Sequence, residues 1–259
     1  MTATHNSKIK SLPVQLYEVI RITEGIPVFL EDHLDRLYQS ARITGLGHLP
    51  DHNKLTRMIS EYIALKNKPN GNIRLIFTYT SPSKPPQFEI SYIPHYYPDQ
   101  NEYSNGVKVG LLHADRPDPQ AKIQNPGLRN RANQSISDHG FFEVLLIDSE
   151  GNITEGSKSN VFFIKNEMLY SSPAEKVLQG ITRLKIMQIC DNEGIPVFES
   201  AIPATTLDQY EGAFLTGTSP KVLAISSIEK INYRTDLPLL IRLQELYDQV
   251  IEDYLHERR

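Results

Sequence analysis

Residues 153–163 read ITEGSKSNVFF, and residues 178–183 downstream read LQGITR. A β-strand pattern over 141–147 breaks at the turn Asp148–Asn152, and an apolar run resumes at Val161. Glu155 is therefore expected on a loop between two buried strands. A carboxylate in such a place needs a partner or a function.

The segment Gly180-Ile181-Thr182 is expected to open an amphipathic helix over 180–193. The first amides of a helix have no partner within the helix, so this start can bind an anion, and we interpret it as a phosphate site. Each feature alone also has an ordinary explanation. Glu-Gly near a turn is usually a solvated corner, and Gly-Ile-Thr is usually a plain helix start.

Together the two motifs resemble the signature of the fold type IV pyridoxal 5′-phosphate (PLP) enzymes, the class IV aminotransferase family. This family includes branched-chain and D-amino acid aminotransferases and 4-amino-4-deoxychorismate lyases. Other parts of the pattern follow in order: LYEVIR at 16–21, LEDHLDRLYQSA at 30–41 and FLTGTS at 214–219. They resemble the first strand, the H-x-x-R-L helix and the second phosphate turn of the family.

Composition fits this resemblance and excludes some classes of protein. A chain of 259 residues with 39% apolar content can bury a substantial core. Its net charge of -4 gives no basic surface for nucleic acid. The single cysteine, Cys190, cannot form an internal disulfide. The start MTATHNSKIKSLP lacks the apolar core of a signal peptide, so we expect a soluble, cytoplasmic protein with no membrane partner.

The apolar patterns predict an α+β protein of two domains. A small α/β N-terminal domain, 1–98, is expected to hold strands at 14–22, 72–80 and 87–93 and helices at 31–45 and 51–66. The polar segment 95–106 has the composition of a linker. A larger, β-rich cofactor-binding domain, 99–259, follows, with flanking helices at 127–139 and 180–193. Its last helix is marked by Leu243, Leu246, Tyr247, Val250, Ile251 and Tyr254.

The resemblance implies roles for a lysine and a carboxylate. Lys122, in Ala121-Lys122-Ile123-Gln124-Asn125, matches a K-x-x-N pattern of the lyase and D-amino acid branches and would be the Schiff-base lysine. Such an amine serves as base and acid at the substrate α-carbon, and burial favours its uncharged form. Glu155 would hold the protonated ring nitrogen of PLP, and Asn160 would hold the segment that carries Glu155.

The cofactor phosphate would be bound by residues of three segments. These are Arg36, the helix start with Ile181 and Thr182, and the turn with Thr218 and Ser219. From the sequence without the family pattern, a surface ion pair between Arg36 and Asp32, four residues earlier, is the favoured alternative. No set of metal ligands is predicted.

Two residues are candidates for substrate binding. Arg74 lies on an otherwise apolar strand and could bind a substrate carboxylate, as branched-chain members do from the matching position. A buried ion pair or an edge-strand side chain reaching for water explains it equally well. Tyr17 would line the same pocket, with a core aromatic as the alternative.

The chain departs from the family pattern in three places. Only about a dozen residues precede Val14, where the family usually has an extra hairpin, so one wall of the substrate pocket would be missing or rebuilt. Pro126-Gly127 stands where the branched-chain branch has a tyrosine. Pro220, Lys221 and Ala224 replace residues common after the second phosphate turn. These departures weaken any choice of branch.

The resemblance implies a PLP-dependent aminotransferase, a homodimer that moves an amino group between an amino acid and a 2-oxo acid by a ping-pong Schiff-base mechanism. Two alternatives stay open. An aminodeoxychorismate lyase would eliminate pyruvate; the K-x-x-N pattern favours it, whereas Arg74 favours the transaminase. A PLP-binding protein without turnover is supported by the short N-terminus. The sequence does not choose the amino acid or its L or D form.

Overall fold

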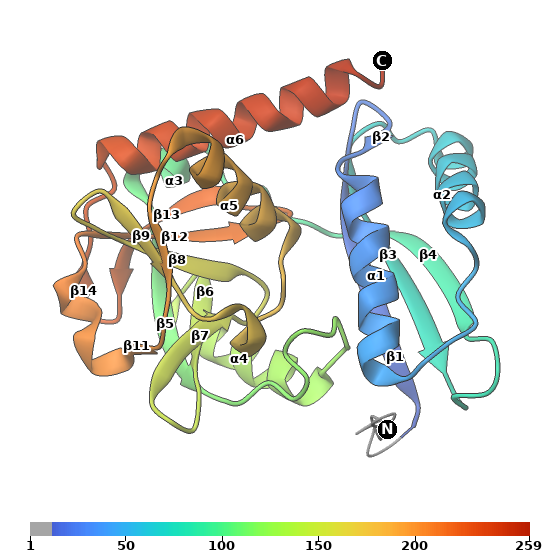
Figure 1. Ribbon diagram of the computed structural model, residues 1–259, viewed down its shortest axis with the longest axis horizontal. Coiled ribbons are helices and arrows are strands. Elements are labelled where there is room, and N and C mark those ends of the chain that lie inside the picture. Colours follow the sequence, from blue (N-terminus) through green and yellow to red (C-terminus); the bar gives the residue numbers. More distant parts are fainter. Residues whose placement is uncertain (1–11) are drawn as a thin grey trace. The chain divides into compact units, whose positions relative to one another are not determined.

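The computed structural model describes residues 12–259 (Figure 1). The chain forms two compact units. Unit 1 runs to His95 and also contains Gln120–Gln124, and unit 2 consists of Tyr96–Pro119 and Asn125–Glu257. The expectations about a signal peptide and a missing N-terminal hairpin concern mainly residues 1–11, which lie outside the described residues.

Unit 1 is a four-stranded antiparallel sheet with two helices on one face (Figure 1). The strand order is β2-β1-β3-β4. The strands are β1 (Val14–Thr23), β2 (Ile26–Pro27), β3 (Gly71–Tyr79) and β4 (Gln87–Ile93), and the helices are α1 (Leu30–Thr44) and α2 (His52–Lys66). These elements confirm the predicted strands and helices of this region to within about two residues.

The alternation along β1 decides which side chains face the helices. Leu16, Glu18 and Ile20 are buried, whereas Tyr17 and Val19 between them are only partly buried. Antiparallel partners share a face, so residues 73, 75 and 77 of β3 join the helix side and Arg74 lies on the opposite side. The core of unit 1 therefore occupies one face of the sheet, and the other face carries polar residues.

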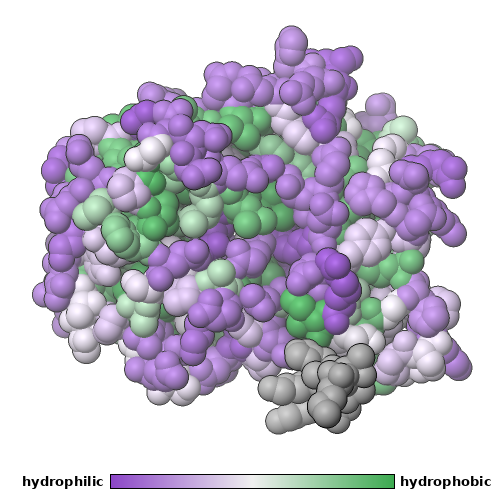
Figure 2. Space-filling model, in the orientation of Figure 1, coloured by the Kyte–Doolittle hydropathy of each residue, from purple (hydrophilic) through white to green (hydrophobic). Residues whose placement is uncertain are grey.

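The spacing of apolar residues and an N-terminal cap explain why helix α2 forms where it does. Leu55, Ile59 and Ile63 repeat every four residues and are its buried residues, each contributing about 1.5–3 kcal/mol. The helix begins where the Asp51 side chain accepts a hydrogen bond from the Lys54 amide. Most of its exposed residues are polar, with Leu65 as an apolar exception that is 80% exposed, and purple prevails on this side at the right of Figure 2.

A short segment of chain completes the edge of β1. Strand β2 pairs only with the end of β1, at Ile22 and Thr23. Further along the same edge, Ile123 forms an antiparallel bridge with Leu16, and the Gln124 amide donates to the Gln15 carbonyl at 2.9 Å. Residues 120–124 therefore fold as part of unit 1 although the chain on both sides belongs to unit 2.

Unit 2 is built on a ten-stranded mixed sheet of order β10-β9-β8-β12-β13-β5-β6-β7-β11, with β14 paired to β13. Its strands are β5 (Val107–His113), β6 (Glu143–Ile147), β7 (Asn152–Gly156), β8 (Asn160–Lys165), β9 (Met168–Ser171), β10 (Val197–Glu199), β11 (Ile202–Pro203), β12 (Gly212–Gly217), β13 (Lys221–Ile228) and β14 (Ile231–Asn232). Its helices are α3 (Gln100–Asn105), α4 (Pro126–His139), α5 (Ile181–Glu193) and α6 (Pro238–His256), with 3-10 turns η1 (Ala174–Lys176) and η2 (Ala204–Gln209).

The two faces of this sheet have different neighbours. One face holds a core cluster that includes Val161, Phe163, Ala213 and Leu215. Because side chains alternate along a strand, the residues between them point to the other face, where α5 contacts β12 and α6 contacts β13. The predicted pattern of α6 is confirmed, with Leu243, Tyr247 and Ile251 among its buried residues.

Three expectations need correction. Glu155 lies in strand β7, which pairs with β6, because the turn at Asp148 is tight: its Oδ1 accepts from the Asn152 amide at 2.9 Å. The segment 95–106 contains helix α3, whose start Asp99 and Glu102 stabilise by a reciprocal capping box. The helical spacing of Leu128, Ala132 and Ile136 predicts a buried stripe on the helix at 127–139, but in α4 only Ala132 is buried.

None of the helices in residues 12–259 combines the length and the apolar character that a membrane span requires. Cys190 is buried, and burial raises the pKa of its thiol to about 11. A thiol of that kind stays protonated and unreactive at neutral pH.

Candidate active site

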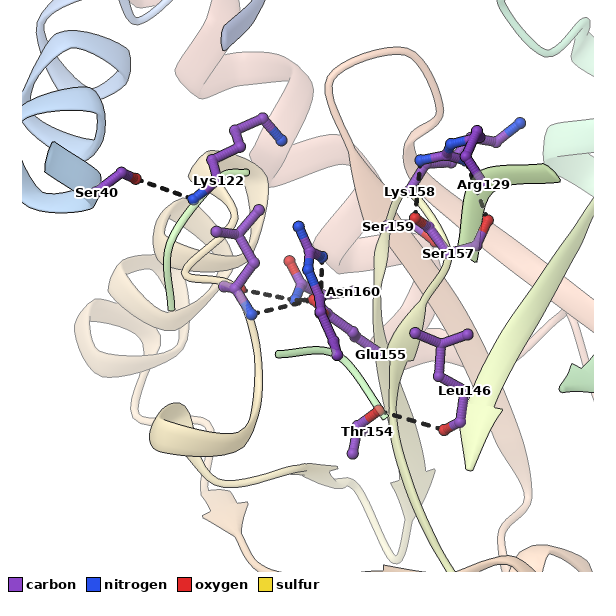
Figure 3. Close-up of polar contacts among 12 residues, drawn as sticks. Ser40, Lys122, Arg129, Leu146, Thr154, Glu155, Ser157, Lys158, Ser159 and Asn160 are labelled. Atoms are coloured by element: carbon purple, nitrogen blue, oxygen red, sulfur yellow. Dashed lines mark hydrogen bonds and ion pairs between the residues drawn. The ribbon is translucent and has the colours of Figure 1, made fainter. Parts of the chain in front are cut away.

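Glu155 is a buried carboxylate whose two oxygens have donors from three segments of unit 2. Its side chain is 3% exposed, and Oε1 accepts from Arg116 Nη1 at 2.8 Å. Oε2 accepts from the Leu178 amide at 3.1 Å and from Asn160 Nδ2 at 3.3 Å (Figure 3). The carboxylate is thus fixed in place. Arg116 was not predicted, because an arginine in an irregular loop carries no periodic signal.

Asn160 joins the Glu155 strand to the start of α5. Its Nδ2 also donates to the Leu178 carbonyl at 2.9 Å, two residues before Gly180. A Cβ atom at Gly180 would lie 2.1 Å from Asn160 Oδ1, a distance that no side chain can accept. Position 180 therefore requires glycine for this close approach.

The turn between β7 and β8 is held by a second buried carboxylate, Glu143. Its side chain accepts from Ser157 Oγ at 2.7 Å and from Ser159 Oγ at 3.0 Å, and also from the amides of Val144 and Lys158. A Cβ at Gly156 would lie 2.1 Å from Ser159 Oγ, so glycine is required there for Ser159 to reach Glu143. The motif Glu-Gly-Ser-Lys-Ser thus encodes the shape of this turn.

Helix α5 begins after Gly180 without a side chain capping its first turn. The amides of Ile181 and Thr182 lie in that turn, where backbone donors have no helical acceptor. Arg183 anchors the turn: its buried guanidinium donates to Gln179 Oε1 at 2.9 Å and pairs with Glu199. The start of α5 therefore has the backbone arrangement of an anion site.

Thr218 and Ser219 form the turn that joins β12 to β13. Just before it, Thr216 is the antiparallel partner of Asn160, so the two side chains share a face. Thr216 is 1% exposed, and its Oγ1 has no hydrogen-bond partner among the described residues. Asn160 thus links Glu155, the start of α5 and the end of β12 within unit 2.

Lys122 lies in unit 1, where hydrogen bonds fix its backbone on both sides. Its amide donates to Ser40 Oγ of α1 at 3.0 Å (Figure 3), and its carbonyl accepts from the Tyr17 amide of β1 at 3.1 Å. The amine Nζ lies 4.8 Å from the centre of the Tyr17 ring. The lysine is therefore positioned by both β1 and α1.

Arg36 of α1 forms a buried charged network with Glu18 and His33. Its Nε and Nη2 donate to the two oxygens of Glu18 at 2.9 and 2.6 Å, and His33 Nδ1 lies 2.8 Å from Glu18 Oε2. Arg36 is only 8% exposed, which removes a solvent-exposed pair with Asp32 as the explanation of this residue. Its role toward a phosphate stays a prediction.

The protonation states in this network follow from burial and charge. Burial alone would raise the pKa of Glu18, but the charge of Arg36 and hydrogen bonds from His33 and Arg36 lower it to about 2. Burial lowers the pKa of His33 in spite of the adjacent carboxylate. At neutral pH Glu18 is therefore charged and His33 neutral, with its Nδ1 proton donated to Glu18.

Arg74 and Tyr17 lie on the same face of the unit 1 sheet, opposite the core. Strand β3 lies between β1 and β4, so Arg74 is not on an edge strand. Arg74 Nε is buried and has no hydrogen-bond partner within residues 12–259. Tyr17 lies beneath the Lys122 amine on that face and outside the core cluster. Their roles toward a substrate stay predictions.

No group of three or more histidine, cysteine, aspartate or glutamate side chains suited to a metal ion occurs among the described residues.

Comparison with known proteins gives a consistent family. The chain is 29% identical to a D-alanine aminotransferase of Bacillus licheniformis over 224 residues, 83% of this chain and 78% of that protein. It is 20% identical to an aminodeoxychorismate lyase of Bacillus subtilis (strain 168) over 263 residues, 95% of this chain and 88% of the lyase.

The fold also matches solved structures. A branched-chain aminotransferase from Thermoproteus uzoniensis, solved with norvaline, superposes with a TM-score of 0.80 over 93% of this chain and 88% of that chain at 24% identity. The model of the family described as amino-transferase class IV matches residues 15–228. The chain therefore belongs to the class IV aminotransferase family, whose members are PLP-dependent enzymes.

Proposed function

We propose that this protein is an aminotransferase that moves an amino group between an amino acid and a 2-oxo acid by a ping-pong mechanism. The observation that carries the proposal is the arrangement around Asn160, which joins a buried carboxylate, Glu155, to the uncapped start of α5. A carboxylate and an anion site held together fit the two ends of PLP, its ring nitrogen and its phosphate.

The donors of unit 2 fit the phosphate of this cofactor. No side-chain cap occupies the first turn of α5, which contains the amides of Ile181 and Thr182. The turn of Thr218 and Ser219 comes directly after Thr216, which pairs with Asn160. The buried hydroxyl of Thr216 has no hydrogen-bond partner in the part of the chain that the structure describes, and this supports the assignment, because such a group costs free energy unless a ligand satisfies it. Arg36 of unit 1 would add a charged donor.

The bound cofactor would supply a pyridinium ring that accepts electrons from the substrate α-carbon. Glu155 would keep the proton on the ring nitrogen, because a negative partner favours the charged form of that nitrogen. Lys122 would hold the cofactor through its amine, then remove a proton from the α-carbon and return it. The hydrogen bonds of its amide and carbonyl fix the backbone of Lys122, so the position of its amine can vary only by rotation within the side chain.

Arg74 would bind the carboxylate of the substrate. Its Nε is a buried donor with no hydrogen-bond partner among residues 12–259, and a substrate carboxylate would supply one. Tyr17, on the same face of the sheet, would line the pocket beside Lys122. Their shared face supports a single substrate pocket on this side of unit 1.

The Lys-x-x-Asn pattern, which by resemblance favours a lyase, also has a structural explanation. The asparagine of the Lys-x-x-Asn pattern, Asn125, is the N-cap of α4, and its Oδ1 accepts from the Leu128 amide at 3.0 Å. A cap residue has a local structural reason to be present. The pattern therefore does not by itself favour elimination of pyruvate over amino transfer.

The function is tested by half-reactions with a panel of L- and D-amino acids. We expect at least one of them to convert the PLP form of the protein to the pyridoxamine form, seen as a change in the absorption spectrum. The Lys122→Ala variant should show no conversion. Release of pyruvate from aminodeoxychorismate without conversion by any amino acid would make the protein a lyase. A protein that binds PLP but acts on neither substrate would be a binder without turnover.

We further propose that the protein is a homodimer, as the family resemblance implies, and that it works in the cytoplasm. Cys190 is a free, buried thiol, which fits a reducing compartment. Light scattering coupled to size-exclusion chromatography at several concentrations measures the oligomeric state, and a mass of one chain would contradict the dimer. Fractionation of the source cells tests the location.

A further inference from the structure

One turn of helix α6 contacts both segments of unit 2 that are proposed to bind the cofactor phosphate. Gln244, Tyr247 and Asp248 follow one another at steps of three and four residues, so their side chains share one side of the helix. All three come after residue 228, where the match to the family model ends. The matched region therefore gives α6 no role, and its contacts have to supply one.

The Tyr247 hydroxyl reaches the start of α5, against which α6 packs (Figure 1). Its oxygen lies 3.1 Å from Thr182 Oγ1, and the two residues are 4% and 3% exposed. Thr182 is one of the two residues whose amides are expected to face the phosphate. A hydrogen bond between two buried hydroxyls is protected from water, so it restrains the first turn of α5 relative to α6.

Gln244 and Asp248 hold the chain directly after the second segment, the turn at 218–220. Asp248 Oδ1 accepts from Lys221 Nζ at 2.7 Å, and Gln244 Nε2 donates to the Val222 carbonyl at 3.2 Å. Lys221 and Val222 are the first two residues of β13. Helix α6 thus restrains the turn through the residues that follow it.

The backbone of Lys221 depends on such contacts. Its φ is +53°, a left-handed value that favours glycine and has a steric cost for a residue with a Cβ atom. A conformation of this kind persists only where the surrounding structure holds it. The ion pair with Asp248 therefore gives a structural reason for the lysine that stands here in departure from the family pattern.

We propose that Tyr247 and Asp248 are positioning residues, which hold the start of α5 and the turn at 218–220 in the one arrangement that binds the phosphate of the cofactor. The inference rests on the phosphate role proposed for these two segments. It assigns no contact with the cofactor to either residue. The two segments are far apart in the sequence, and α6 is an element that contacts both.

The test compares two probes, PLP and pyridoxal, which lacks the phosphate. The measured quantity is the dissociation constant of pyridoxal divided by that of PLP, determined by equilibrium dialysis on the full chain freed of bound cofactor. A phosphate site gives this selectivity a value well above one. A general loss of stability weakens both probes alike and leaves the selectivity unchanged, whereas a displaced phosphate site lowers it.

Tyr247→Phe should lower the selectivity by roughly fivefold, as expected for the loss of one buried hydrogen bond. Tyr233→Phe is the matched control, because it removes another buried hydroxyl of unit 2, which donates to the Leu207 carbonyl at 2.8 Å. The selectivity of this control should equal that of the unaltered protein.

Asp248→Asn should lower the selectivity by about two- to threefold. The effect is smaller because the ion pair is partly exposed, and because Tyr103 also holds the turn by donating to the Pro220 carbonyl at 3.1 Å. Asp248→Glu keeps the charge and should retain most of the selectivity. The matched control is Asp236→Asn, which breaks an exposed ion pair with Arg234 and should have no effect.

The outcomes separate the inference from the proposal on which it rests. A selectivity near one in the unaltered protein would show that the chain does not bind the phosphate, and the proposed phosphate site would fail together with the inference. If the unaltered protein is selective but Tyr247→Phe and Asp248→Asn behave like their controls, the phosphate site stands and only the positioning inference is overturned.

Discussion

The two units fix their candidate site residues by different physical means. In unit 1 a cation, Arg36, is held by a buried anion, Glu18. In unit 2 the expected phosphate donors are amides and hydroxyls, and their arrangement depends on the missing side chain of Gly180. Charge interactions change slowly with distance, whereas close-packed contacts fail within a fraction of an ångström. Substitutions should therefore act through charge in unit 1 and through shape in unit 2.

The largest effect is expected from the amine that unit 1 supplies. Lys122→Ala should lower kcat/KM by at least about 10⁴-fold, since both the attachment of the cofactor and the proton transfer are lost. Lys158→Ala is the matched control in unit 2, where the side chain lies 5.8 Å from the Phe142 ring and only its amide meets Glu143. Steady-state kinetics of both variants check this. Similar losses in the two would contradict the assignment.

The pH dependence of stability isolates the charged pair of unit 1. The pKa of Glu18 falls from 4.5 to about 2 on folding, so its carboxylate stabilises the folded state fully above about pH 4.5. That contribution is lost as the pH falls toward 2. We expect Glu18→Gln to destabilise the protein by about 3 kcal/mol at pH 7, because Arg36 loses its buried partner.

Urea unfolding between pH 7 and pH 2 measures this dependence. The difference in free energy of unfolding between the unaltered protein and Glu18→Gln should shrink as the pH falls below 4.5. Glu61→Gln, an exposed position on α2, serves as the control and should change little at any pH. A constant difference over the whole range would show that Glu18 contributes by packing rather than by charge.

The shape of unit 2 is tested at Gly180. In Gly180→Ala the new Cβ would lie 2.1 Å from Asn160 Oδ1, so Asn160 or the start of α5 must move. We expect a loss of about 1–3 kcal/mol in stability and a PLP affinity weaker by roughly tenfold. Gly127→Ala, where a Cβ would meet only Asn125 Oδ1 at 3.7 Å, should leave both unchanged. Thermal unfolding and PLP titration report the two quantities.

The smallest effect is expected at Thr216. Thr216→Val removes a buried hydroxyl that has no hydrogen-bond partner within residues 12–259, so the cofactor-free protein should become more stable by about 1 kcal/mol. PLP should then bind about fivefold more weakly if this hydroxyl faces the phosphate. Thr154→Val removes a hydroxyl that donates to the Leu146 carbonyl at 3.3 Å, and it should lose stability instead. Unchanged PLP affinity in Thr216→Val would exclude Thr216 from the site.

Local patterns in the sequence predict the elements of this fold well. The period-two pattern of β1, the four-residue spacing in α2 and the apolar stripe of α6 place these elements to within a few residues. Helix α3 was missed because the composition of segment 95–106 outweighed a capping signal, Asp99 followed by Glu102, that the sequence does contain.

The supports of the site are harder to predict because they depend on contacts between distant segments. Glu18 meets partners 15 and 18 residues away, and Arg116 lies 39 residues before Glu155. Glu143 occupies a buried position of a strand, which an alternating pattern assigns to an apolar residue. A glutamate at a buried strand position could have been noticed in the sequence. It indicates that the carboxylate has a buried partner, but it does not identify which residue that partner is.

Residues 120–124 belong to unit 1 although the segments on both sides belong to unit 2. This insertion affects which fragments can fold and in what order the units are completed during synthesis. A fragment that ends near residue 98 would leave the edge of β1 without its partners at Lys122 and Gln124. During synthesis, unit 1 stays incomplete until residue 124 has left the ribosome, after the first strand of unit 2 has already been made. Expression of unit 1 alone therefore requires a grafted copy of 120–124, and circular permutation should avoid breaks on either side of it.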